Sequence, residues 1–343
     1  MEKQISIIIP TCNMERYISQ CLESLLIPNL SDVEILVIND GSKDRSSDIA
    51  HDYERRFPES IRVIDKPNGH YGSCINRGLK EATGRYIKVL DADDSFNKNE
   101  FNMFVEFLRG VSTEIVFSDY CIVDEYGTIT SKKCFPKRLY NKVMTFGNAL
   151  PLFLHENMAM HAVAYRTDFL KSIQYSQTEG VAYTDQEWIF APVLNVNTAA
   201  YFPHIVYRYL VGRQGQSVDS SVITKAMTLQ MAHFSKRLDD FEEMLPKLSQ
   251  EHRQYAFARM RYSMVNTFKC ILFGKTTSHF SHQLLENDIK LNRVFPELYE
   301  SLQAERLKPR IPFHYIKYWR NRYPKGKPMP IISIIKAFSK LDY

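Results

Sequence analysis

The chain has 343 residues, of which 44% are hydrophobic and 24% charged, a composition typical of a soluble globular protein. This length exceeds one average domain, so we expect one large domain with an appendage, or two domains. The formal net charge is +5, but the last 38 residues carry ten lysines and arginines against one acid. This segment therefore has a net charge of +9, and the rest of the chain is weakly acidic.

The sequence shows no targeting or membrane-spanning pattern. Its start, MEKQISIIIPTCN, lacks the basic region, apolar core and small-residue cleavage site of a secretory signal. No uninterrupted apolar run approaches the roughly 20 residues that a membrane-spanning helix needs. The six cysteines are scattered, without a CxxC pair or zinc-ligand spacing, which favours reduced thiols. We therefore expect a cytoplasmic protein.

The first hundred residues alternate between apolar runs of strand length and segments with helical spacing. We predict strands at 5–10, 33–40, 61–66 and 85–94, separated by helices at 14–26, 43–57 and 72–84. Strands rich in Ile and Val, separated by amphipathic helices, predict a doubly wound α/β sheet with buried parallel strands. In such sheets ligands bind at the carboxyl ends of the strands.

The pattern is looser after residue 100. Residues 113–133 predict a strand, a turn at Tyr126-Gly127 and a returning strand, and 158–170 and 199–211 predict further strands. From residue 221 onward apolar residues recur at three- and four-residue intervals, which predicts helices. We therefore divide the chain into an α/β domain at 1–220, a helical region at 221–304 and a basic, aromatic tail at 305–343.

The predicted strand at 85–94 ends in Asp91-Ala92-Asp93-Asp94. Three carboxylates at a strand end repel one another and lose solvation unless a positive group joins them. Because side chains alternate along a strand, Asp91 and Asp93 are expected to point to the same side. Together they offer oxygen ligands suited to Mg²⁺ or Mn²⁺. The alternative is an ordinary Asp-rich turn.

Other strand ends also carry polar, turn-forming residues. Asp40 precedes Gly41-Ser42, where its carboxylate could accept from a ribose hydroxyl or a base N–H, or could instead cap the next helix. The segment 66–78 combines glycines with a helix start and Arg77, an arrangement that favours a diphosphate. The alternative for Arg77 is a solvated helix face.

Three segments carry a resemblance to a known family: SIIIPTCNMERYISQCLESL, EILVINDGSKDRS and NGHYGSCINRGLKEATGRYIKVLDADD. In order and spacing they resemble the family 2 glycosyltransferases over about the first 95 residues. The resemblance implies a GT-A fold, Rossmann-like with a mostly parallel sheet flanked by helices, here with a helical C-terminal region. It also implies an enzyme that moves a sugar from a nucleotide diphosphate donor to an acceptor hydroxyl, with inversion at the anomeric carbon.

The resemblance assigns roles to the strand-end residues. It implies contacts to the donor nucleotide from Pro10, Thr11, Asn13, Asp40, Asn68, Gly72, Arg77, Asp91 and Ala92. Among these, Asp40 would contact base or ribose, and Asp91 would face the ribose or a metal-bound water. Asp93 would bind the divalent cofactor, Mn²⁺ or Mg²⁺.

An inverting transfer needs a general base that takes the acceptor proton. In the family, an acidic pair at a helix start downstream of the Asp-x-Asp motif supplies it, and the matching segment here is AYTDQEWIFAP. Thr184 replaces the first acid, so the resemblance implies Asp185 as the base, with Glu187 pointing away. The alternative for Asp185 is a carboxylate that merely stabilises the start of a helix.

The segment 207–221 predicts a flexible loop, because it contains two glycines, two glutamines and several serines. Such a loop could fold over a phosphate, with Arg208 and Arg213 as the candidate diphosphate contacts. The alternative is a plain surface loop. His161 lies in an apolar segment, where a structural role is favoured over a contact to the acceptor.

The C-terminal tail mixes its cations with aromatic residues, among them Phe313, Tyr315, Tyr318, Trp319 and Tyr323. This mixture suits an anionic membrane surface, and no nucleic-acid-binding motif accompanies it. The alternative is a solvated extension wrapped over the catalytic domain. At a membrane, the acceptor would be a saccharide or lipid-linked saccharide in cell-surface polysaccharide biosynthesis.

We therefore predict a metal-dependent, inverting glycosyltransferase with a UDP-sugar as the expected donor, located in the cytoplasm or at the inner face of the membrane. Two alternatives stay open. A sugar-phosphate nucleotidylyltransferase should open with a glycine-rich loop, whereas PTCNMERY contains no glycine. A non-catalytic module would bind the nucleotide sugar and tolerate loss of Asp185.

Overall fold

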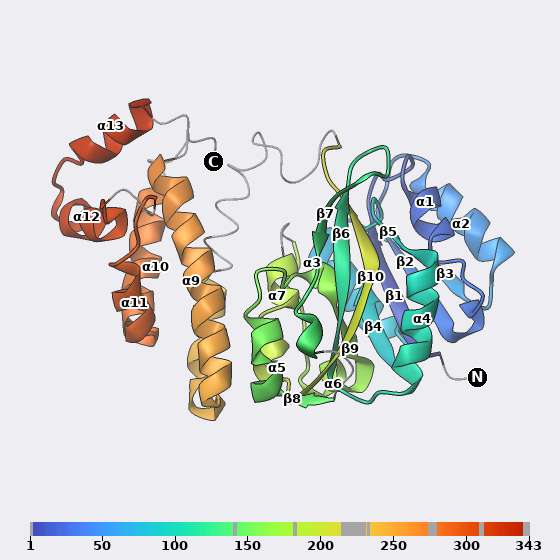
Figure 1. Cartoon of the computed structure of the whole chain (residues 1–343). Coiled ribbons are helices and arrows are strands. Elements are labelled where there is room, and N and C mark those ends of the chain that lie inside the picture. Colours follow the sequence, from blue (N-terminus) through green and yellow to red (C-terminus); the bar gives the residue numbers. More distant parts are fainter. Residues whose placement is uncertain are drawn as a thin grey trace. The chain divides into compact units, whose positions relative to one another are not determined.

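The computed structural model divides the chain into two compact units, Met1–Gln216 and Ser217–Tyr343, and each is considered by itself (Figure 1). The structure describes residues 3–139, 143–180, 184–213, 231, 234–273, 280–308 and 312–338. The division at 1–220, 221–304 and 305–343 stays a prediction, since residues 214–230 lie outside the described ranges.

The first four strands of the N-terminal unit form a parallel sheet, as predicted. They are β1 (Ile5–Thr11), β2 (Val33–Asp40), β3 (Ile61–Lys66) and β4 (Tyr86–Val89), in the order β3-β2-β1-β4. The helices between them are α1 (Ile18–Glu23), α2 (Ser46–Arg56) and α3 (His70–Glu81). Ile5, Ile7, Ile8 and Ile9 of β1 are fully buried, because helices cover both faces of a central parallel strand.

The second half of the sheet contains antiparallel pairings. Its strands are β5 (Ser95–Phe96), β6 (Ile115–Val123), β7 (Ile129–Lys133), β8 (Met144–Thr145), β9 (Val163–Arg166) and β10 (Thr198–Leu210). The full order is β3-β2-β1-β4-β9-β6-β10-β5, with β7 beside β6 and β8 beside β10. β9 runs antiparallel to β4 and β6, while β10 runs parallel to β6. The result is a mixed α/β sheet, so the predicted fold class is confirmed.

The later strand predictions can also be compared with the structure, and the one at 199–211 is confirmed as β10. The hairpin predicted at 113–133 is confirmed as β6 and β7, joined by a turn in which Gly127 has a φ of +77°. The strand predicted at 158–170 was too long, because only Val163–Arg166 is a strand. Short helices precede and follow it, and an apolar run does not by itself distinguish a strand from a buried helix.

Helices lie on both faces of the sheet (Figure 1). α1, α2 and α4 (Lys98–Arg109) cover one face, and α3, α5 (Phe146–Phe153), α6 (Thr167–Ser172) and α7 (Asp185–Trp188) lie on the other. The described part of the unit also contains short 3-10 helices: η1 (Leu30–Asp32), η2 (Lys137–Leu139), η3 (Met160–Ala162) and η4 (Val193–Asn195).

The C-terminal unit is helical in its described part. It contains η5 (Leu245–Lys247), α9 (Gln250–Phe273), α10 (Ser281–Val294), α11 (Pro296–Leu302), α12 (Tyr315–Arg322), η7 (Tyr323–Lys325) and α13 (Pro330–Phe338). Trp319 of α12 is fully buried against Phe268 of α9, and Arg320 forms a buried ion pair with Asp288 of α10. The start of the predicted tail is therefore part of this unit's core. No helix of the described residues is long and apolar enough to cross a membrane.

Candidate active site

The residues Asp91–Asp94 form a turn rather than the end of a strand. β4 ends at Val89, and the amide of Asp94 donates to the carbonyl of Asp91 at 2.9 Å. Such a turn brings its first and fourth residues together, so Asp91 approaches Asp94. The strand alternation expected to pair Asp91 with Asp93 does not apply here. The motif is therefore an Asp-rich turn, and this turn can still provide ligands for a cation.

Asp91 is held by two tyrosines from distant parts of the chain. The Tyr71 hydroxyl of α3 donates to Asp91 Oδ1 at 2.8 Å, and the Asp91 amide donates to the Tyr207 hydroxyl at 3.2 Å. Burial, followed by the charge of Asp93, raises the pKa of Asp91 to about 7. A negative charge on Asp91 beside that of Asp93 is therefore unfavourable unless a cation binds between or near them.

Asp94 fixes the end of β10. Its Oδ2 accepts from the Tyr207 hydroxyl at 2.5 Å, and its Oδ1 accepts from the Leu210 amide at 2.7 Å. The side chain is 3% exposed, and burial together with the charge of Asp91 raises its pKa. Asp94 thus joins the turn after β4 to the last strand of the sheet.

Asp93 is paired with an arginine that the sequence predicted as a diphosphate contact. Arg213 Nε lies 2.6 Å from Asp93 Oδ2, and its guanidinium lies over the Tyr17 ring at 5.3 Å. The two paired side chains are 13% and 11% exposed, so the pair is largely shielded from water. The structure therefore brings Asp93 and Arg213 together directly.

His161 lies beside the carboxylates on a small platform of aromatic rings. Its ring stacks on Tyr209 with centroids 4.5 Å apart and contacts Tyr207 at 4.6 Å. Burial, followed by the charge of Lys88, lowers the pKa of His161 to about 3, so the ring is neutral. The fully buried Lys88 donates to the carbonyls of His161 and Val163 at 2.7 and 3.2 Å, which ties β4 to this segment.

These residues fit a hard divalent cation. Asp91, Asp94 and His161 place ligand atoms within 4.8 Å of one another. Within the described part of the chain, Asp91 Oδ2 accepts no hydrogen bond and His161 Nδ1 is buried without a partner. Carboxylate oxygens with a neutral imidazole form a common donor set for Mn²⁺, and the raised pKa of Asp91 shows that the cluster favours a positive partner.

Asp185 begins α7 and lies at the edge of this cluster. Its charge is among the causes, after burial, that raise the pKa values of Tyr71, Asp91 and Tyr209. The neighbouring acid, Glu187, is 6% exposed and accepts from the Thr178 amide at 2.9 Å. Glu187 therefore points into the protein, whereas the charge of Asp185 acts on the cluster.

A second polar cluster lies at the carboxyl ends of β2 and β3. Asp40 is 3% exposed, and its Oδ1 receives the Lys66 ammonium at 2.5 Å and the Gly69 amide at 2.9 Å. Asn68 Nδ2 donates to the Asp40 carbonyl at 2.9 Å. Asp40 and Asn68 are thus brought together, and Lys66 joins them as a residue that the sequence did not single out.

The loop that follows β1 is hydrogen-bonded to the segment that precedes α2. Asn13 has a φ of +55°, and its Oδ1 accepts from the Lys43 amide at 2.7 Å. Thr11 is buried and donates to the carbonyl of Ile9, while Pro10 is partly exposed. Asn13 therefore shapes this loop, and its predicted contact with the nucleotide base stays a prediction, as do those of Pro10 and Thr11.

Gly72 and Asn76 pack α3 against residues 177–178. A Cβ on Gly72 would lie 2.0 Å from the carbonyl oxygen of Thr178. Asn76 exchanges two hydrogen bonds of 2.8 Å with the backbone of Gln177. Gly72 thus permits a close approach of backbone to backbone.

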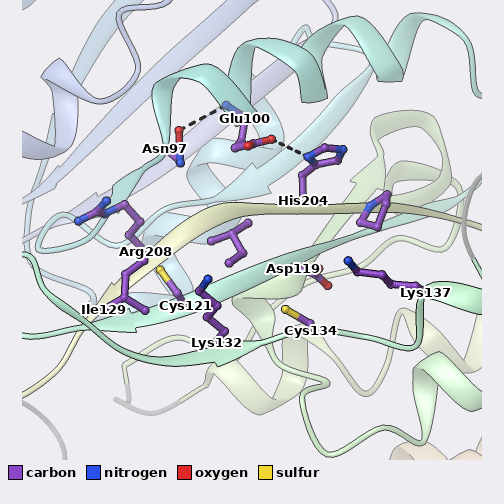
Figure 2. A pocket seen from close by; sticks show the side chains of 12 residues that line it. Asn97, Glu100, Asp119, Cys121, Ile129, Lys132, Cys134, Lys137, His204 and Arg208 are labelled. Carbon is purple, nitrogen blue, oxygen red and sulfur yellow. Dashed lines mark hydrogen bonds and ion pairs between the residues drawn. The ribbon is translucent and has the colours of Figure 1, made fainter.

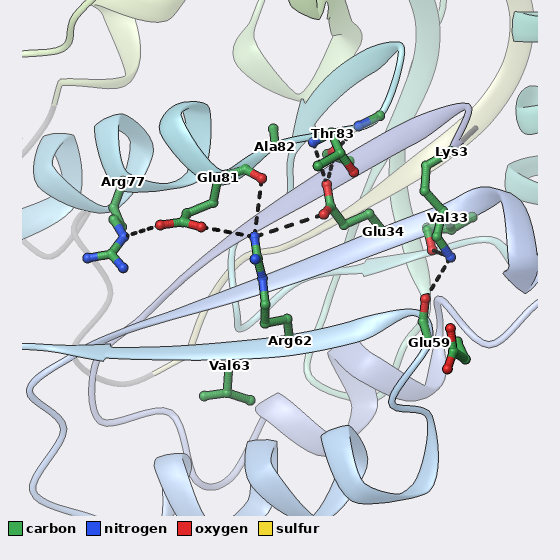
Figure 3. A network of polar contacts seen from close by, with 12 residues as sticks. Lys3, Val33, Glu34, Glu59, Arg62, Val63, Arg77, Glu81, Ala82 and Thr83 are labelled. Atoms are coloured by element: carbon green, nitrogen blue, oxygen red, sulfur yellow. Dashed lines mark hydrogen bonds and ion pairs between the residues drawn. The ribbon is translucent and has the colours of Figure 1, made fainter. Parts of the chain in front are cut away.

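Two predicted arginines do not reach the carboxylates. Arg77 Nε pairs with Glu81 at 2.9 Å in a surface network with Arg62 and Glu34 (Figure 3). The loop predicted at 207–221 was wrong at its start, because β10 continues to Leu210. Arg208 lies between Tyr207 and Tyr209 in this strand, so strand alternation directs it to the opposite face, where it donates to the Gly127 carbonyl. In this structure Arg213 is the predicted diphosphate arginine that contacts the site.

The chain is similar to a known protein family and to several curated proteins. Residues 6–171 match the model of glycosyl transferase family 2. The uncharacterized glycosyltransferase EpsJ of Bacillus subtilis (strain 168) is 45% identical over 112 residues, 33% of this chain and 32% of EpsJ. The minor teichoic acid biosynthesis protein GgaB of the same organism is 34% identical over 112 residues, 32% of this chain and 12% of GgaB. The chain therefore spans about a third or less of these relatives.

A solved structure extends the likeness to the fold. The S. aureus TarS 1–349 crystal structure in complex with UDP-GlcNAc has a TM-score of 0.67 and 20% identity, covering 94% of this chain and 92% of that one. At this level of identity the likeness concerns the fold. Residues 6–171, just under half of the chain, therefore match glycosyl transferase family 2, and the mixed sheet with its flanking helices has a fold of the GT-A type.

Proposed function

We propose that this protein transfers a sugar from a nucleotide-diphosphate donor to an acceptor hydroxyl, with inversion at the anomeric carbon. The observation that carries the proposal is the placement of two clusters at the carboxyl ends of β2, β3 and β4. One contains Asp40, Lys66 and Asn68. The other contains Asp91, Asp93, Asp94 and His161. Such strand ends are where open α/β sheets bind nucleotides.

Two similar proteins support the donor and acceptor classes that we propose. TarS is solved with UDP-GlcNAc, and the printed description of GgaB is a teichoic acid biosynthesis protein. We accordingly propose a UDP-sugar as donor and a saccharide or lipid-linked chain of the cell-surface polysaccharides as acceptor. Pro10, Thr11, Asn13, Asp40, Asn68 and Ala92 remain the proposed nucleotide contacts.

In the proposed reaction the acceptor oxygen bonds to the anomeric carbon while the bond to the diphosphate oxygen breaks. Asp185 takes the proton of the acceptor hydroxyl, since it is the acid of α7 whose charge acts on the cluster, while Glu187 is turned into the protein. Asp91, Asp93, Asp94 and His161 would hold Mn²⁺ or Mg²⁺, which offsets charge on the leaving diphosphate when bound. Arg213 can contribute a second positive group there once it leaves Asp93.

The test is calorimetric titration with UDP-, GDP- and dTDP-sugars, with and without Mn²⁺, on the wild type and on Asp93→Asn. We expect one UDP-sugar to bind with Mn²⁺ and to bind at least about tenfold more weakly without the metal or in the variant. Absence of binding by every nucleotide sugar would refute the proposal.

Product analysis distinguishes the two alternatives. A transferase releases a nucleoside diphosphate when acceptor is added, whereas a nucleotidylyltransferase forms or consumes pyrophosphate. A binding module would bind the donor in the calorimeter and release neither product. Either of these last two outcomes would replace the proposed activity.

A further inference from the structure

A pocket of about 450 Å³ lies between β6, β7, β10 and the start of α4 (Figure 2). It is on the face of the sheet opposite the carboxylates. The evidence is the alternation of β10, in which Tyr207 and Tyr209 contact His161 while Arg208 between them lines the pocket. The pocket is therefore separate from the donor cluster.

Three cations line this pocket from adjacent elements. Arg208 of β10 is in register with Cys121 of β6, which is in register with Lys132 of β7. Residues in register on neighbouring strands share a face, and strands lie about 4.8 Å apart, so Arg208 and Lys132 start about 10 Å from each other. Lys137 of η2 adds the third cation.

The charges of these cations affect the pKa values of Cys121 and Cys134, the two cysteines that line the pocket. Burial raises the pKa of the Cys121 thiol, and the charges of Arg208 and Lys132 act in the opposite direction. Burial and Asp119 raise the pKa of the Cys134 thiol, whereas Lys132 and Lys137 lower it. Each pair of cations thus lies close to one sulfur, which supports their convergence on the pocket.

The two acids that line the pocket already have partners. Glu100 pairs with His204 at 2.8 Å. Asp119 is 2% exposed, and its Oδ1 accepts from the Phe135 amide at 3.0 Å and the Tyr201 hydroxyl at 2.8 Å. Among the residues that the structure describes, Arg208, Lys132 and Lys137 form no ion pair, and the Arg208 guanidinium makes one hydrogen bond, to Gly127.

We propose that this pocket binds a phosphate-bearing organic ligand. Three cations without carboxylate partners suit a phosphate, which spreads up to two negative charges over three oxygens and can accept a forked contact from Arg208. The volume exceeds that of inorganic phosphate, and Asn97 and His204 offer polar contacts to an attached polyol or sugar. The inference is independent of the proposed transfer reaction, because the sheet separates the two sites.

The test uses Cys134, which is exposed at the pocket, as a reporter of occupancy. Alkylation of Cys134 by iodoacetamide is followed by peptide mass spectrometry in the full chain, with Cys270 as internal reference. Glycerol 3-phosphate and a glycerol phosphodiester are the two probes, and sodium chloride matches their ionic strength. At a probe concentration of about twice the Kd, we expect alkylation of Cys134 to slow about threefold while that of Cys270 is unchanged.

Variants at matched positions make the assignment specific. Lys132→Gln and Arg208→Gln should remove the protection, whereas Lys133→Gln should keep it, because Lys133 is the adjacent β7 residue on the opposite face. Protection by the monoester alone indicates a small phosphate metabolite, and protection by both probes indicates the phosphodiester of a polymer or lipid headgroup. If neither probe protects more than salt does, or if Lys132→Gln behaves as Lys133→Gln, the proposal is overturned.

Discussion

Asp185 is the residue on which the proposed chemistry depends most directly. Replacing it with Asn removes the proton acceptor while preserving shape, so we expect transfer to slow by about 10²- to 10⁴-fold. Donor affinity should stay unchanged, because the base acts on the acceptor. The measurement is steady-state release of nucleoside diphosphate together with calorimetric donor binding.

The matched control for this variant is Asp168→Asn, which removes an exposed carboxylate from the first turn of α6. It should leave the rate near that of the wild type. A rate for Asp185→Asn within about threefold of the wild type would exclude this residue as the base.

Asp91 makes the stability of the metal-free protein depend on pH. Its pKa is about 7 in the folded protein against 3.8 for an ordinary Asp, chiefly because of burial. Between these values the folded state binds more protons than the unfolded state, so the free energy of unfolding should fall as pH rises from about 4 to 7. Urea midpoints measured across this range in EDTA test the sign.

Asp91→Asn should reduce this pH dependence, because the amide does not titrate, and added Mn²⁺ should stabilise the wild type most at the upper end of the range. A stability that rises with pH, or an unchanged slope in the variant, would contradict the assignment.

At the scale of elements, α3 holds the segment that positions α7. Gly72 allows the close contact with Thr178, and Gln177 in turn donates to Thr184 at the start of α7 at 2.7 Å. Gly72→Ala should therefore destabilise the fold by about 1–3 kcal/mol through overpacking. It should also lower the transfer rate, because the segment that carries Asp185 shifts.

Chemical denaturation and the transfer assay check both parts of this prediction. The control is Gly110→Ala, whose new Cβ would have its nearest neighbour, the Phe107 carbonyl oxygen, at 3.6 Å. Equal stabilities of the two variants would show that the α3 contact is not critical.

The same elements show what the sequence could and could not predict. The apolar runs predicted β1 to β4, and polar residues at their ends predicted Asp40 and Asp91, since parallel strands end at a common edge. Tyr207 was not predicted as part of the site, and a structural role was favoured for His161, because the contacts of both residues are long-range. The sequence did not separate Arg208 from Arg213, because both fell in the loop predicted at 207–221, whereas β10 continues to Leu210 and includes Arg208.

At the scale of the whole molecule, the C-terminal unit uses its aromatic residues in two ways. Tyr315 and Trp319 are fully buried, so they stabilise the unit and are not available to a membrane. Lys325 and Lys327 are exposed near the start of α13, where Ile331 and Ile334 are 43% and 55% exposed. These four residues are the ones we expect at an anionic membrane surface.

Vesicle co-sedimentation tests this expectation. Each lysine near an anionic surface contributes about 1 kcal/mol, so Lys325→Gln with Lys327→Gln should weaken binding to anionic vesicles about 30-fold. The double control Lys80→Gln with Lys98→Gln removes the same charge from the N-terminal unit. Similar binding of the wild type to neutral and anionic vesicles would argue against a membrane role.

The structural role of Asp94 affects which residues evolution retains in proteins of this kind. Its carboxylate accepts from the Tyr207 hydroxyl and the Leu210 amide, so the last aspartate of the motif helps to anchor the end of β10 whether or not a sugar is transferred. Natural selection for folding alone would retain it. A descendant that had lost all transferase activity could therefore keep this aspartate for many generations, and Asp185 would be the more informative position for distinguishing working enzymes from inactive relatives.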